Sequence, residues 1–573
     1  MENIWRVKNT IKDFELYNKF PDVNKIILNI LYNRGILEDK IYSFLNPDYD
    51  KDIYDPFLFN NMQKVVDKIF DTIKNRGKIC VYGDYDADGV GSCFLLVSFL
   101  KKIGGDVFCY IPDRKNEGNG LNKKAIDYIK DKGTNLIITV DNGIVAFDET
   151  NYIHSLDMEI IISDHHEQMP HRLPNAYAII NPKVEGEKYP FRELCGAGVV
   201  FKIISALALE HKDRDELLKY IKWNLDIVAV ATISDLVPLV DENRVIAKYG
   251  LTVLNKTRNL GLKEIIKVSN LTDLQGVEKK EISSYDVGFR IGPRLNAAGR
   301  MDHANAAYEL LMSSDKEEVR KIAEDLNEKN NERQNIVTNA VRWFIKENGD
   351  KIDDRKIIVV HNDSWPVGIV GLIAAKLKDY YNLPVFALTT EDNNIVGSGR
   401  SIEGFDITKA MQNNSNLFLK FGGHKMACGC TIAYDKYNEF KRVMSEYANQ
   451  NLNIGEIEHY LDIDLEIEFK DINIDFCNEI KKFEPFGKNN EDLVFCSKNV
   501  EVVGCSIFGK NADHFKMNVK QGDTLFSVVS FYNRDLFDKI KVGDRLDLAY
   551  SIEVDNWGGK QEIRLMYKDH KYE

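Results

Sequence analysis

The segment Lys78-Ile-Cys-Val-Tyr-Gly-Asp-Tyr-Asp-Ala-Asp-Gly89 joins a short apolar run to a loop in which three aspartates alternate between two glycines. The run from Lys78 to Tyr82 predicts a buried strand, because it is short, apolar and followed by a turn signal. The three carboxylates can converge on one point only if the loop bends, and the glycines permit that bend. Close carboxylates repel each other unless cations neutralise them, and oxygen ligands suit Mg²⁺ or Mn²⁺. Taken alone, the loop is also compatible with an acidic solvated turn or a calcium loop, although it is too short for an EF-hand.

Strands and helices alternate on the C-terminal side of this loop. Continuous β-branched runs between helices predict a parallel sheet that is covered on both faces. Three of the strands end in an aspartate or in the Asp loop, and ligands of parallel sheets bind beyond the carboxyl ends of the strands. The sequence therefore predicts an anionic pocket at one edge of the sheet. The expected strands are 78–82, 106–111, 135–140, 158–163 and 176–180, and the expected helices are 90–101, 123–132, 198–210 and 213–231.

The predicted fold class is α/β, with more than one unit. Helical patterns before residue 55 predict an N-terminal appendage, followed by a helix over 62–74. A stretch without proline or internal glycine predicts a long connecting helix or a helical pair, and a second α/β segment follows it. Short strands separated by glycine turns then predict an OB-like barrel. The expected domains are 1–55 (helical appendage), 56–303 (catalytic), 304–348 (connecting helical segment), 349–455 (second α/β) and 456–573 (barrel).

The bulk composition narrows the class of protein. The chain has 573 residues and a formal net charge of −13, which argues against a protein that coats nucleic acid with its whole surface. Nine cysteines are scattered without a Cys-x-x-Cys pair, so we expect reduced thiols in a cytoplasmic protein. We find no signal peptide and no apolar run that is long enough to span a membrane.

Five further residues are candidates for a metal centre, and four of them follow strands at the same sheet edge. Asp141 follows its strand directly, although Asp-Asn-Gly is also a common turn. A single histidine near a strand end is more often structural, but Asp164-His165-His166 places two adjacent imidazoles after a strand, and an imidazole shifts the preference toward Mn²⁺. Asp235 follows an apolar helix, where capping is its ordinary role. No Ser-His-Asp or Cys-His group suggests a side-chain nucleophile.

Taken together, these segments resemble the DHH phosphoesterase superfamily, named for its Asp-His-His triplet, and within it the RecJ exonucleases. The resemblance runs in family order along nearly the whole chain and includes the accessory domain that follows DHH domains and the OB region. Besides the triplet, the matching segments are Pro112–Leu121, Asp141–Ile144, Leu194–Lys202, Phe289–Arg300, Gly397–Asp406, Phe421–His424, Glu484–Gly487 and Asp555–Gly559.

The resemblance implies an activity and its residues. The implied activity is 5′→3′ hydrolysis of single-stranded DNA to 5′-mononucleotides in DNA recombination and repair, with two divalent cations, Mn²⁺ or Mg²⁺. The implied metal ligands are Asp84, Asp86, Asp88, Asp141 (bridging), His165 and Asp235, and the catalytic group adds His166, which faces the phosphate. The implied substrate residues are Arg114, Arg294, Asn296, Arg300, Ser398, Arg400, Ser401, Gly422, Gly423 and His424, of which Arg114, Ser398 and Arg400 hold the 5′ phosphate. Phe508, Lys510, His514 and Lys516 are candidates for a groove in the barrel. The implied partners are a RecQ-type helicase and single-strand-binding protein.

Three positions depart from the family pattern. Asn119 replaces an aromatic residue, Pro366 replaces a histidine, and Gly91 replaces a hydroxyl residue. None is an expected metal ligand, so the departures concern affinity and processivity. Two other functions stay open as alternatives. One is a DHH phosphodiesterase for short oligoribonucleotides or cyclic dinucleotides, and the other is a non-catalytic scaffold subunit of a replicative helicase.

Overall fold

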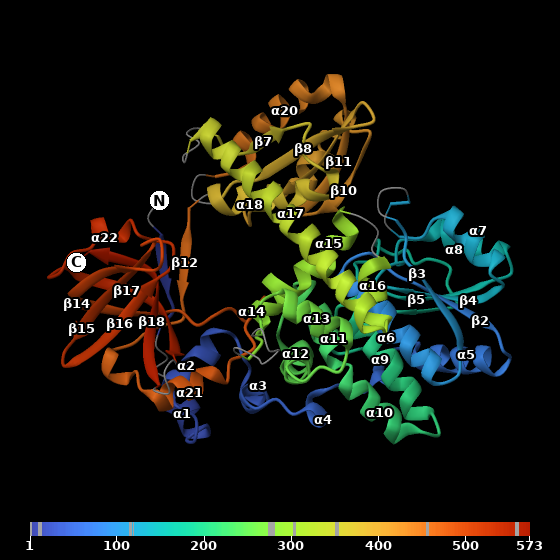
Figure 1. Cartoon of the computed structure of the whole chain (residues 1–573), viewed down its shortest axis with the longest axis horizontal. Helices are drawn as coiled ribbons and strands as arrows, with labels where there is room; N and C mark the ends of the chain where they lie inside the picture. Colours follow the sequence, from blue (N-terminus) through green and yellow to red (C-terminus); the bar gives the residue numbers. More distant parts are fainter. Residues whose placement is uncertain are drawn as a thin grey trace.

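The computed structural model describes residues 3–9, 14–113, 117–118, 120–272, 281–301, 305–349, 355–453, 458–555 and 561–572. Arg114 and Asn119, together with residues 556–559 of the last matching segment, lie outside these ranges. Figure 1 shows a first α/β unit on the right, a second α/β unit at the top and a barrel on the left, with α17 (Lys316–Asn348) leading from the first unit to the second.

The first sheet is parallel throughout, with strand order β3-β2-β4-β5-β6. The chain passes from β2 to β3 on one side and then returns to β4 on the other side of β2. The strand order therefore reverses at β2, and such switch points are where open α/β sheets bind ligands. The five predicted strands are confirmed within two residues at their ends. Their bounds are β2 (Lys78–Tyr82), β3 (Asp106–Tyr110), β4 (Thr134–Val140), β5 (Glu159–Ser163) and β6 (Ala178–Ile180).

Helices cover both faces of this sheet, as the continuous apolar strands predict. Ile79 and Val81 of β2 belong to the larger core, whereas Cys80 and Tyr82 point into a smaller one on the other face. The larger core contains α5 (Met62–Lys74), α6 (Ala87–Lys102) and α9 (Gly196–Glu210), and the smaller core contains α7 (Lys123–Asp131) and α8 (Phe147–Ser155).

The single helix expected over 213–231 is wrong, because the structure has two helices there. α10 (Arg214–Trp223) is amphipathic and lies at the surface, and Asn224 separates it from α11 (Leu225–Ser234), which is buried on all sides. The chain must change direction between a half-exposed and a fully buried helix, and apolar periodicity does not reveal that break. α12 (Asp241–Leu254) and α13 (Leu260–Val268) complete this unit.

The connection to the second unit is a helical pair, one of the two forms expected. α14 (Ser284–Asp286), a π-helical turn (η3, Val287–Ile291) and α15 (Gly292–Met301) lead to α16 (Asn305–Met312) and α17. The second sheet has strand order β10-β11-β9-β8-β7, in which only β7 and β8 are parallel. α18 (Val367–Tyr381) and α17 pack on one face, with α19 (Ile407–Gln412) and α20 (Tyr437–Asn451) on the other. Its strands are β7 (Ile358–His361), β8 (Val385–Glu391), β9 (Asn394–Arg400), β10 (Lys420–His424) and β11 (Ala427–Ala433).

The C-terminal strands close into a five-stranded barrel, as predicted. The order is β14-β15-β16-β18-β17, and pairing of β14 with β17 closes the ring. The barrel strands are β14 (Phe495–Phe508), β15 (His514–Gln521), β16 (Thr524–Ser530), β17 (Arg545–Asp555) and β18 (Glu562–Tyr572).

The N-terminal helices do not stand alone. Side chains of α1 (Phe14–Lys19), α2 (Lys25–Asn33) and α3 (Ile41–Leu45) share one hydrophobic core with the barrel. β1 (Ile4–Val7) also pairs with β12 (Tyr460–Ile463). The segment expected to be an appendage therefore packs with the last part of the chain, and Figure 1 shows both at the left. Within the described ranges, no helix has the length and apolar character required to cross a bilayer.

Candidate metal centre and substrate surfaces

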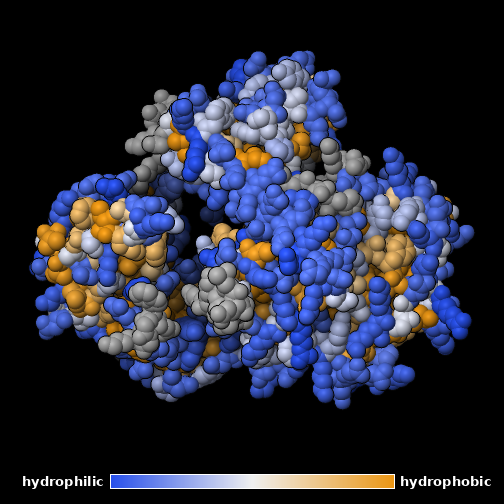
Figure 2. All heavy atoms as spheres, viewed as in Figure 1, coloured by the Kyte–Doolittle hydropathy of each residue, from blue (hydrophilic) through white to orange (hydrophobic). Residues whose placement is uncertain are grey.

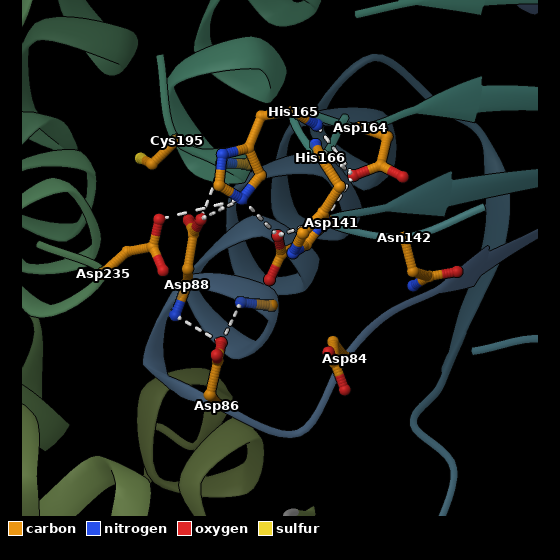
Figure 3. A network of polar contacts seen from close by, with 12 residues as sticks. Asp84, Asp86, Asp88, Asp141, Asn142, Asp164, His165, His166, Cys195 and Asp235 are labelled. Carbon is orange, nitrogen blue, oxygen red and sulfur yellow. Dashed lines mark hydrogen bonds and ion pairs between the residues drawn. The ribbon is translucent and has the colours of Figure 1, made fainter. Parts of the chain in front are cut away.

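The Asp loop bends because Asp86 begins α6. The Asp86 carboxylate accepts hydrogen bonds from the backbone N–H groups of Asp88 and Gly89, each over 3.0 Å, as an N-cap residue does. Asp84 lies at the start of the loop and accepts the N–H of Tyr85 over 2.7 Å. In Figure 3, Asp84 and Asp86 lie on the side of the site away from His165.

Asp88 is held by the N-terminus of α9. Its two carboxylate oxygens accept the backbone N–H groups of Gly196 (2.6 Å) and Ala197 (2.7 Å). Only 1% of Asp88 is exposed. Burial and then the charge of Asp86 raise the pKa of Asp88 to about 7, although the two N–H groups oppose that shift. The helix end therefore fixes the position of a carboxylate that water does not reach.

Asp141 comes directly after β4 and approaches the same point. It adopts a left-handed backbone conformation with φ of 62°. A Cβ on Gly196 would lie 2.7 Å from the Asp141 Cβ, so only glycine fits there without displacing a neighbour. Burial, followed by the charges of Asp88 and Asp86, raises the pKa of Asp141 well above the usual carboxyl range. The carboxylates at this site therefore repel one another unless a cation or protons balance their charge.

His165 lies among three of these carboxylates. Its Nε2 is 3.0 Å from Asp141 Oδ1, 3.8 Å from Asp88 Oδ2 and 3.7 Å from Asp235 Oδ2. Burial, followed by the positive charge of His166, lowers the pKa of His165 to about 3. The imidazole is therefore neutral at physiological pH, which is the form that binds metals.

Asp164 turns away from this group and orients His166. Its Oδ1 accepts the N–H groups of His165 (2.7 Å) and His166 (3.1 Å) and lies 2.8 Å from His166 Nδ1, while its Oδ2 accepts the N–H of Ile144 over 2.9 Å. Burial opposes protonation of His166, but the hydrogen bond and charge of Asp164 outweigh it and raise the pKa of His166 to about 9. His166 is half-exposed and positively charged at neutral pH. The two adjacent histidines thus differ in charge.

The donor set fits a divalent cation. Asp88, His165 and Asp235 each offer a ligand atom within 4.8 Å of the others, and so do Asp141, His165 and His166. Asp141 Oδ1 and His165 Nε2 are buried 3.0 Å apart, and among the described residues neither makes a hydrogen bond of normal geometry. Buried polar atoms without a partner are rare, and a mixed carboxylate–imidazole set suits Mn²⁺. Asp84 and Asp86 are not part of either group.

Ser398 and Arg400, both expected to hold the 5′ phosphate, meet a third expected substrate residue, Arg300, at the N-terminal part of α18. Arg400 donates from Nη1 to Ser398 Oγ over 2.7 Å. Its Nη2 lies 3.0 Å from where a Cβ on Gly371 of α18 would stand. Arg300 reaches the same helix by donating to the carbonyl of Gly368 over 3.4 Å. Two guanidinium groups at a helix N-terminus bring positive charge and N–H donors together, which suits a phosphate.

The two other expected residues of α15 face different neighbours. Asn296 accepts the N–H of Ala87 over 2.7 Å, so it supports the start of α6 and the Asp loop. Arg294 turns to α17 and donates to Asn327 Oδ1 over 3.0 Å and to the carbonyl of Arg290 over 2.6 Å. The structure thus places Arg294 away from the carboxylates.

The substrate residues expected in the second unit also differ in what they contact. Ser401 is buried and donates its hydroxyl to the carbonyl of Phe405 over 2.6 Å, so this hydroxyl holds a loop and does not face a ligand. Gly422 and His424 are exposed on β10. Gly423 has φ of 149°, and a Cβ there would lie 2.4 Å from a backbone carbonyl of β11. Close strand approach explains this glycine without a substrate.

Aromatic rings gather at one end of the barrel. The His514 ring lies 5.0 Å from Phe508, 5.1 Å from Phe531 and 4.7 Å from Tyr532, between ring centroids. Tyr532 is 82% exposed, so part of this cluster can stack on a base. Sequence reasoning missed Phe531 and Tyr532, because they follow β16 and come close to His514 only in the folded barrel. The four residues expected there, Phe508, Lys510, His514 and Lys516, lie on β14, in the following turn and on β15.

A loop of the barrel unit, residues 482–490, supports the segment after Asp235. The N–H of Leu239 donates to the carbonyl of Lys488 over 2.8 Å. A Cβ on Gly487 would lie 2.6 Å from Leu239 Cδ1. The buried Arg244 of α12 donates to the carbonyl of Phe483 over 2.7 Å. Sequence reasoning also missed this support, because it joins residues about 240 positions apart and its hydrogen-bond acceptors are backbone carbonyls.

Comparison with known proteins matches this architecture. Three family models match in order: "DHH family, N-terminal domain" over residues 78–232, "DHHA1 domain" over 354–450 and "RecJ OB domain" over 463–569. A single-stranded-DNA-specific exonuclease RecJ of Bacillus subtilis is 36% identical across 96% of this chain and 68% of its own length. The chain belongs to the RecJ family. A relative of the same name from Haemophilus influenzae is 29% identical across 90% of this chain and 91% of its own length.

Solved structures of RecJ proteins share the fold. The Mn²⁺ complex of RecJ from Thermus thermophilus aligns with a TM-score of 0.82 and 22% identity, across 99% of this chain and 79% of its own. A manganese-bound exonuclease RecJ aligns with a TM-score of 0.58 and 27% identity, across 68% of this chain and 95% of its own. The RecJ-family arrangement of two α/β units and a barrel is therefore present here.

Proposed function

We propose that this RecJ-family chain is a metal-dependent exonuclease that degrades single-stranded DNA from its 5′ end and releases 5′-mononucleotides. The carrying observation is His165, a neutral buried imidazole whose Nε2 lies within 4 Å of three carboxylates at the switch point of a parallel sheet. The relatives named single-stranded-DNA-specific exonuclease and the manganese-bound relative support the substrate and the metal.

Asp88, Asp141, His165 and Asp235 would hold the cations, which we infer to be Mn²⁺ or Mg²⁺. Bound there, the cations would supply a water of lowered pKa and neutralise charge on the scissile phosphate. The fold holds three of these carboxylates in place: α9 fixes Asp88, β4 fixes Asp141, and the end of α11 fixes Asp235. Asp86 and Asp84 complete the anionic loop, and we propose that they act on the outer side of the site.

His166 has a different task in this proposal. It is half-exposed beside Asp141, with Nδ1 4.0 Å from Asp141 Oδ1, and Asp164 keeps it protonated at neutral pH. A cationic imidazole can donate a hydrogen bond to a phosphate oxygen, and such charge-assisted bonds are stronger than neutral ones. His166 would thus orient the scissile phosphate against the carboxylate group.

The preference for degradation from the 5′ end would come from the residues around Arg400. Arg400, Ser398 and Arg300 converge on the N-terminal part of α18 and can bind a terminal phosphate. α15 links these residues to the Asp loop, since Asn296 bonds Ala87 and Arg300 bonds α18. A 5′ phosphate held there would present the adjacent phosphodiester to the carboxylates.

The barrel favours long DNA strands over short oligonucleotides as substrates. Its aromatic cluster around His514 offers ring faces for bases, which is typical of single-strand grooves. The alternative substrates, cyclic dinucleotides and short oligoribonucleotides, would not reach it. A non-catalytic scaffold would not need the complete carboxylate set. We further propose a cytoplasmic enzyme that receives strands from a RecQ-type helicase and single-strand-binding protein.

A strand labelled at either end tests the function. With Mn²⁺, a 5′-labelled single strand should release labelled mononucleotide in the first turnovers, while a 3′-labelled strand keeps its label until late. Faster release from the 3′ end, or preference for dinucleotides, would contradict the proposal. Asp141→Ala is the matched control, and it should abolish turnover while its circular dichroism spectrum stays that of the wild type.

A further inference from the structure

One buried amide joins two segments that lead to candidate metal ligands. Asn243, the third residue of α12, is fully buried. Its Nδ2 donates to the carbonyl of Glu193 over 2.6 Å and to the carbonyl of Pro238 over 3.0 Å. Because carbonyl oxygens can only accept, both N–H groups of the amide must point at them, and the orientation of the amide is fixed. Asn243 therefore holds two distant parts of the chain at a set separation.

The Glu193 side leads to two of the ligands. The first two backbone N–H groups of α9, which begins shortly after Glu193, hold the carboxylate of Asp88. Burial lowers the pKa of His165 most, and the backbone of Leu194 lies beside the imidazole and opposes that shift, as an accepting carbonyl does. One short segment thus orients both Asp88 and His165.

The Pro238 side leads to the third ligand. Asp235 follows the last residue of α11, and only Leu236 and Val237 separate it from Pro238. Leu236 has a left-handed backbone conformation with φ of 58°, so the chain turns directly after the ligand. The position of Asp235 therefore depends on the group that holds the end of this turn. The three residues reached from Asn243 are those of one candidate cation site, Asp88, His165 and Asp235.

The residues on either side of Asn243 fix the start of α12. Glu242 makes a fully buried ion pair with Lys202 of α9. Arg244 donates to the carbonyl of Phe483 in the barrel unit over 2.7 Å. Figure 2 shows a hollow between the barrel and the first α/β unit, and Arg244 makes one of the contacts that join these two units. Because its neighbours are tied to α9 and to the barrel unit, Asn243 has a defined position from which to hold the two carbonyls.

We propose that Asn243 is a positioning residue for the metal centre, which keeps Asp88 and His165 at ligand distance from Asp235. The inference rests on the proposed function and adds a residue that belongs to neither ligand group. Replacing a residue that orients metal ligands from behind typically lowers metal affinity by about 10–100-fold. Loss of Asn243 should therefore weaken one of the two cations, the one that Asp88, His165 and Asp235 would hold.

Titration with MnCl₂ alone measures this role in the full chain. In isothermal titration calorimetry, Asn243→Ala should lose about 10–100-fold in Mn²⁺ affinity at one of two sites. Its affinity for a single strand in EDTA should stay that of the wild type. Asn243→Ser keeps one donor for two carbonyls, so its Mn²⁺ affinity should fall between those of wild type and Asn243→Ala. The serine variant also keeps the proposal testable if Asn243→Ala does not fold.

Asn255→Ala is the matched control. Asn255 lies at the other end of α12, and its Nδ2 also donates to two carbonyls, those of Leu251 over 2.9 Å and Ile282 over 3.2 Å. Neither acceptor adjoins a candidate metal ligand. Asn255→Ala removes the same kind of hydrogen bonds, so it should lower the melting temperature while both Mn²⁺ affinities stay those of the wild type.

A double variant tests whether Asn243 acts through Asp235. In the Asp235→Asn background the Pro238 side no longer carries a charged ligand, so Asn243→Ala should cause little further loss of Mn²⁺ affinity.

Three outcomes would overturn the assignment. One is an unchanged Mn²⁺ affinity of Asn243→Ala, and another is a loss of the same size in Asn255→Ala. The third is an equal loss on adding Asn243→Ala to wild type and to Asp235→Asn. If the wild type itself binds no Mn²⁺, the proposed function fails first, and that result is distinct from these.

Discussion

Replacing Asp235 by asparagine should have opposite effects on stability with and without metal. The ligand atoms of Asp235 and Asp88 lie within 4.8 Å of each other. At an effective dielectric constant of about 20, two charges at that distance repel by about 3 kcal/mol. The Asp235 side chain is 26% exposed, and the pair can also take up protons, so only part of that energy is felt. We expect Asp235→Asn to raise the free energy of unfolding of the metal-free protein by about 1–2 kcal/mol at pH 8.

The pH dependence follows from the sign of the pKa shift. Burial, followed by the charges of Asp88 and Asp86, raises the pKa of Asp235. A carboxyl whose folded pKa is raised stabilises the protein below its unfolded pKa, and that stability is lost as the pH rises through the folded value. The difference in free energy of unfolding between Asp235→Asn and wild type should therefore be largest at pH 8 and should vanish near pH 4.

Urea unfolding in EDTA and in Mn²⁺ measures both effects. Saturating Mn²⁺ at about 100 times its Kd should stabilise the wild type by about 2.7 kcal/mol, and the variant, which lacks one ligand, by much less. The order of stability would then reverse between the two conditions. A variant less stable than wild type in EDTA, or equal stabilisation of both proteins by Mn²⁺, would refute repulsion between Asp235 and Asp88 and the role of Asp235 as a ligand.

Three further substitutions test the supports of the site. Gly196→Ala would press its Cβ on Asp141, so Mn²⁺ affinity measured by calorimetry should fall at least tenfold while DNA binding in EDTA is kept; unchanged affinity would contradict the contact. Asp164→Asn removes the charge that keeps His166 protonated, so the basic limb of the pH–rate profile should move down from about pH 9, and a profile like that of wild type would exclude this role for His166. A Cβ at Gly487 would press on Leu239 and displace the segment that follows Asp235, so Gly487→Ala should lower kcat more than it raises KM. Gly522→Ala in a barrel turn should leave both nearly unchanged.

The sheet and its carboxylate edge could be predicted because the information is local. Lys78–Tyr82 is apolar on both faces and is followed by the Asp loop, and Asp141 comes directly after an apolar strand, so their position at one edge follows from the strand pattern alone. Parallel strands bring their carboxyl ends together, and this brought Asp141 and His165 to one point.

The rest depends on contacts that leave no periodic signal. Backbone N–H groups of Gly196 and Ala197 bind Asp88, and no side-chain pattern identifies a backbone donor. The N-terminal helices pack on a barrel more than 400 residues away, and apolar periodicity shows that a helix face is buried but not what covers it.

We propose that Asp88, Asp141, His165 and Asp235 form a centre for two divalent cations. The most direct test is anomalous diffraction at the manganese edge from crystals grown with Mn²⁺. We predict two anomalous peaks at the carboxyl end of β4, one of them bonded to His165 together with Asp88 and Asp235. Absence of any peak at these residues, with Mn²⁺-dependent nuclease activity in the dissolved crystals, would contradict the account.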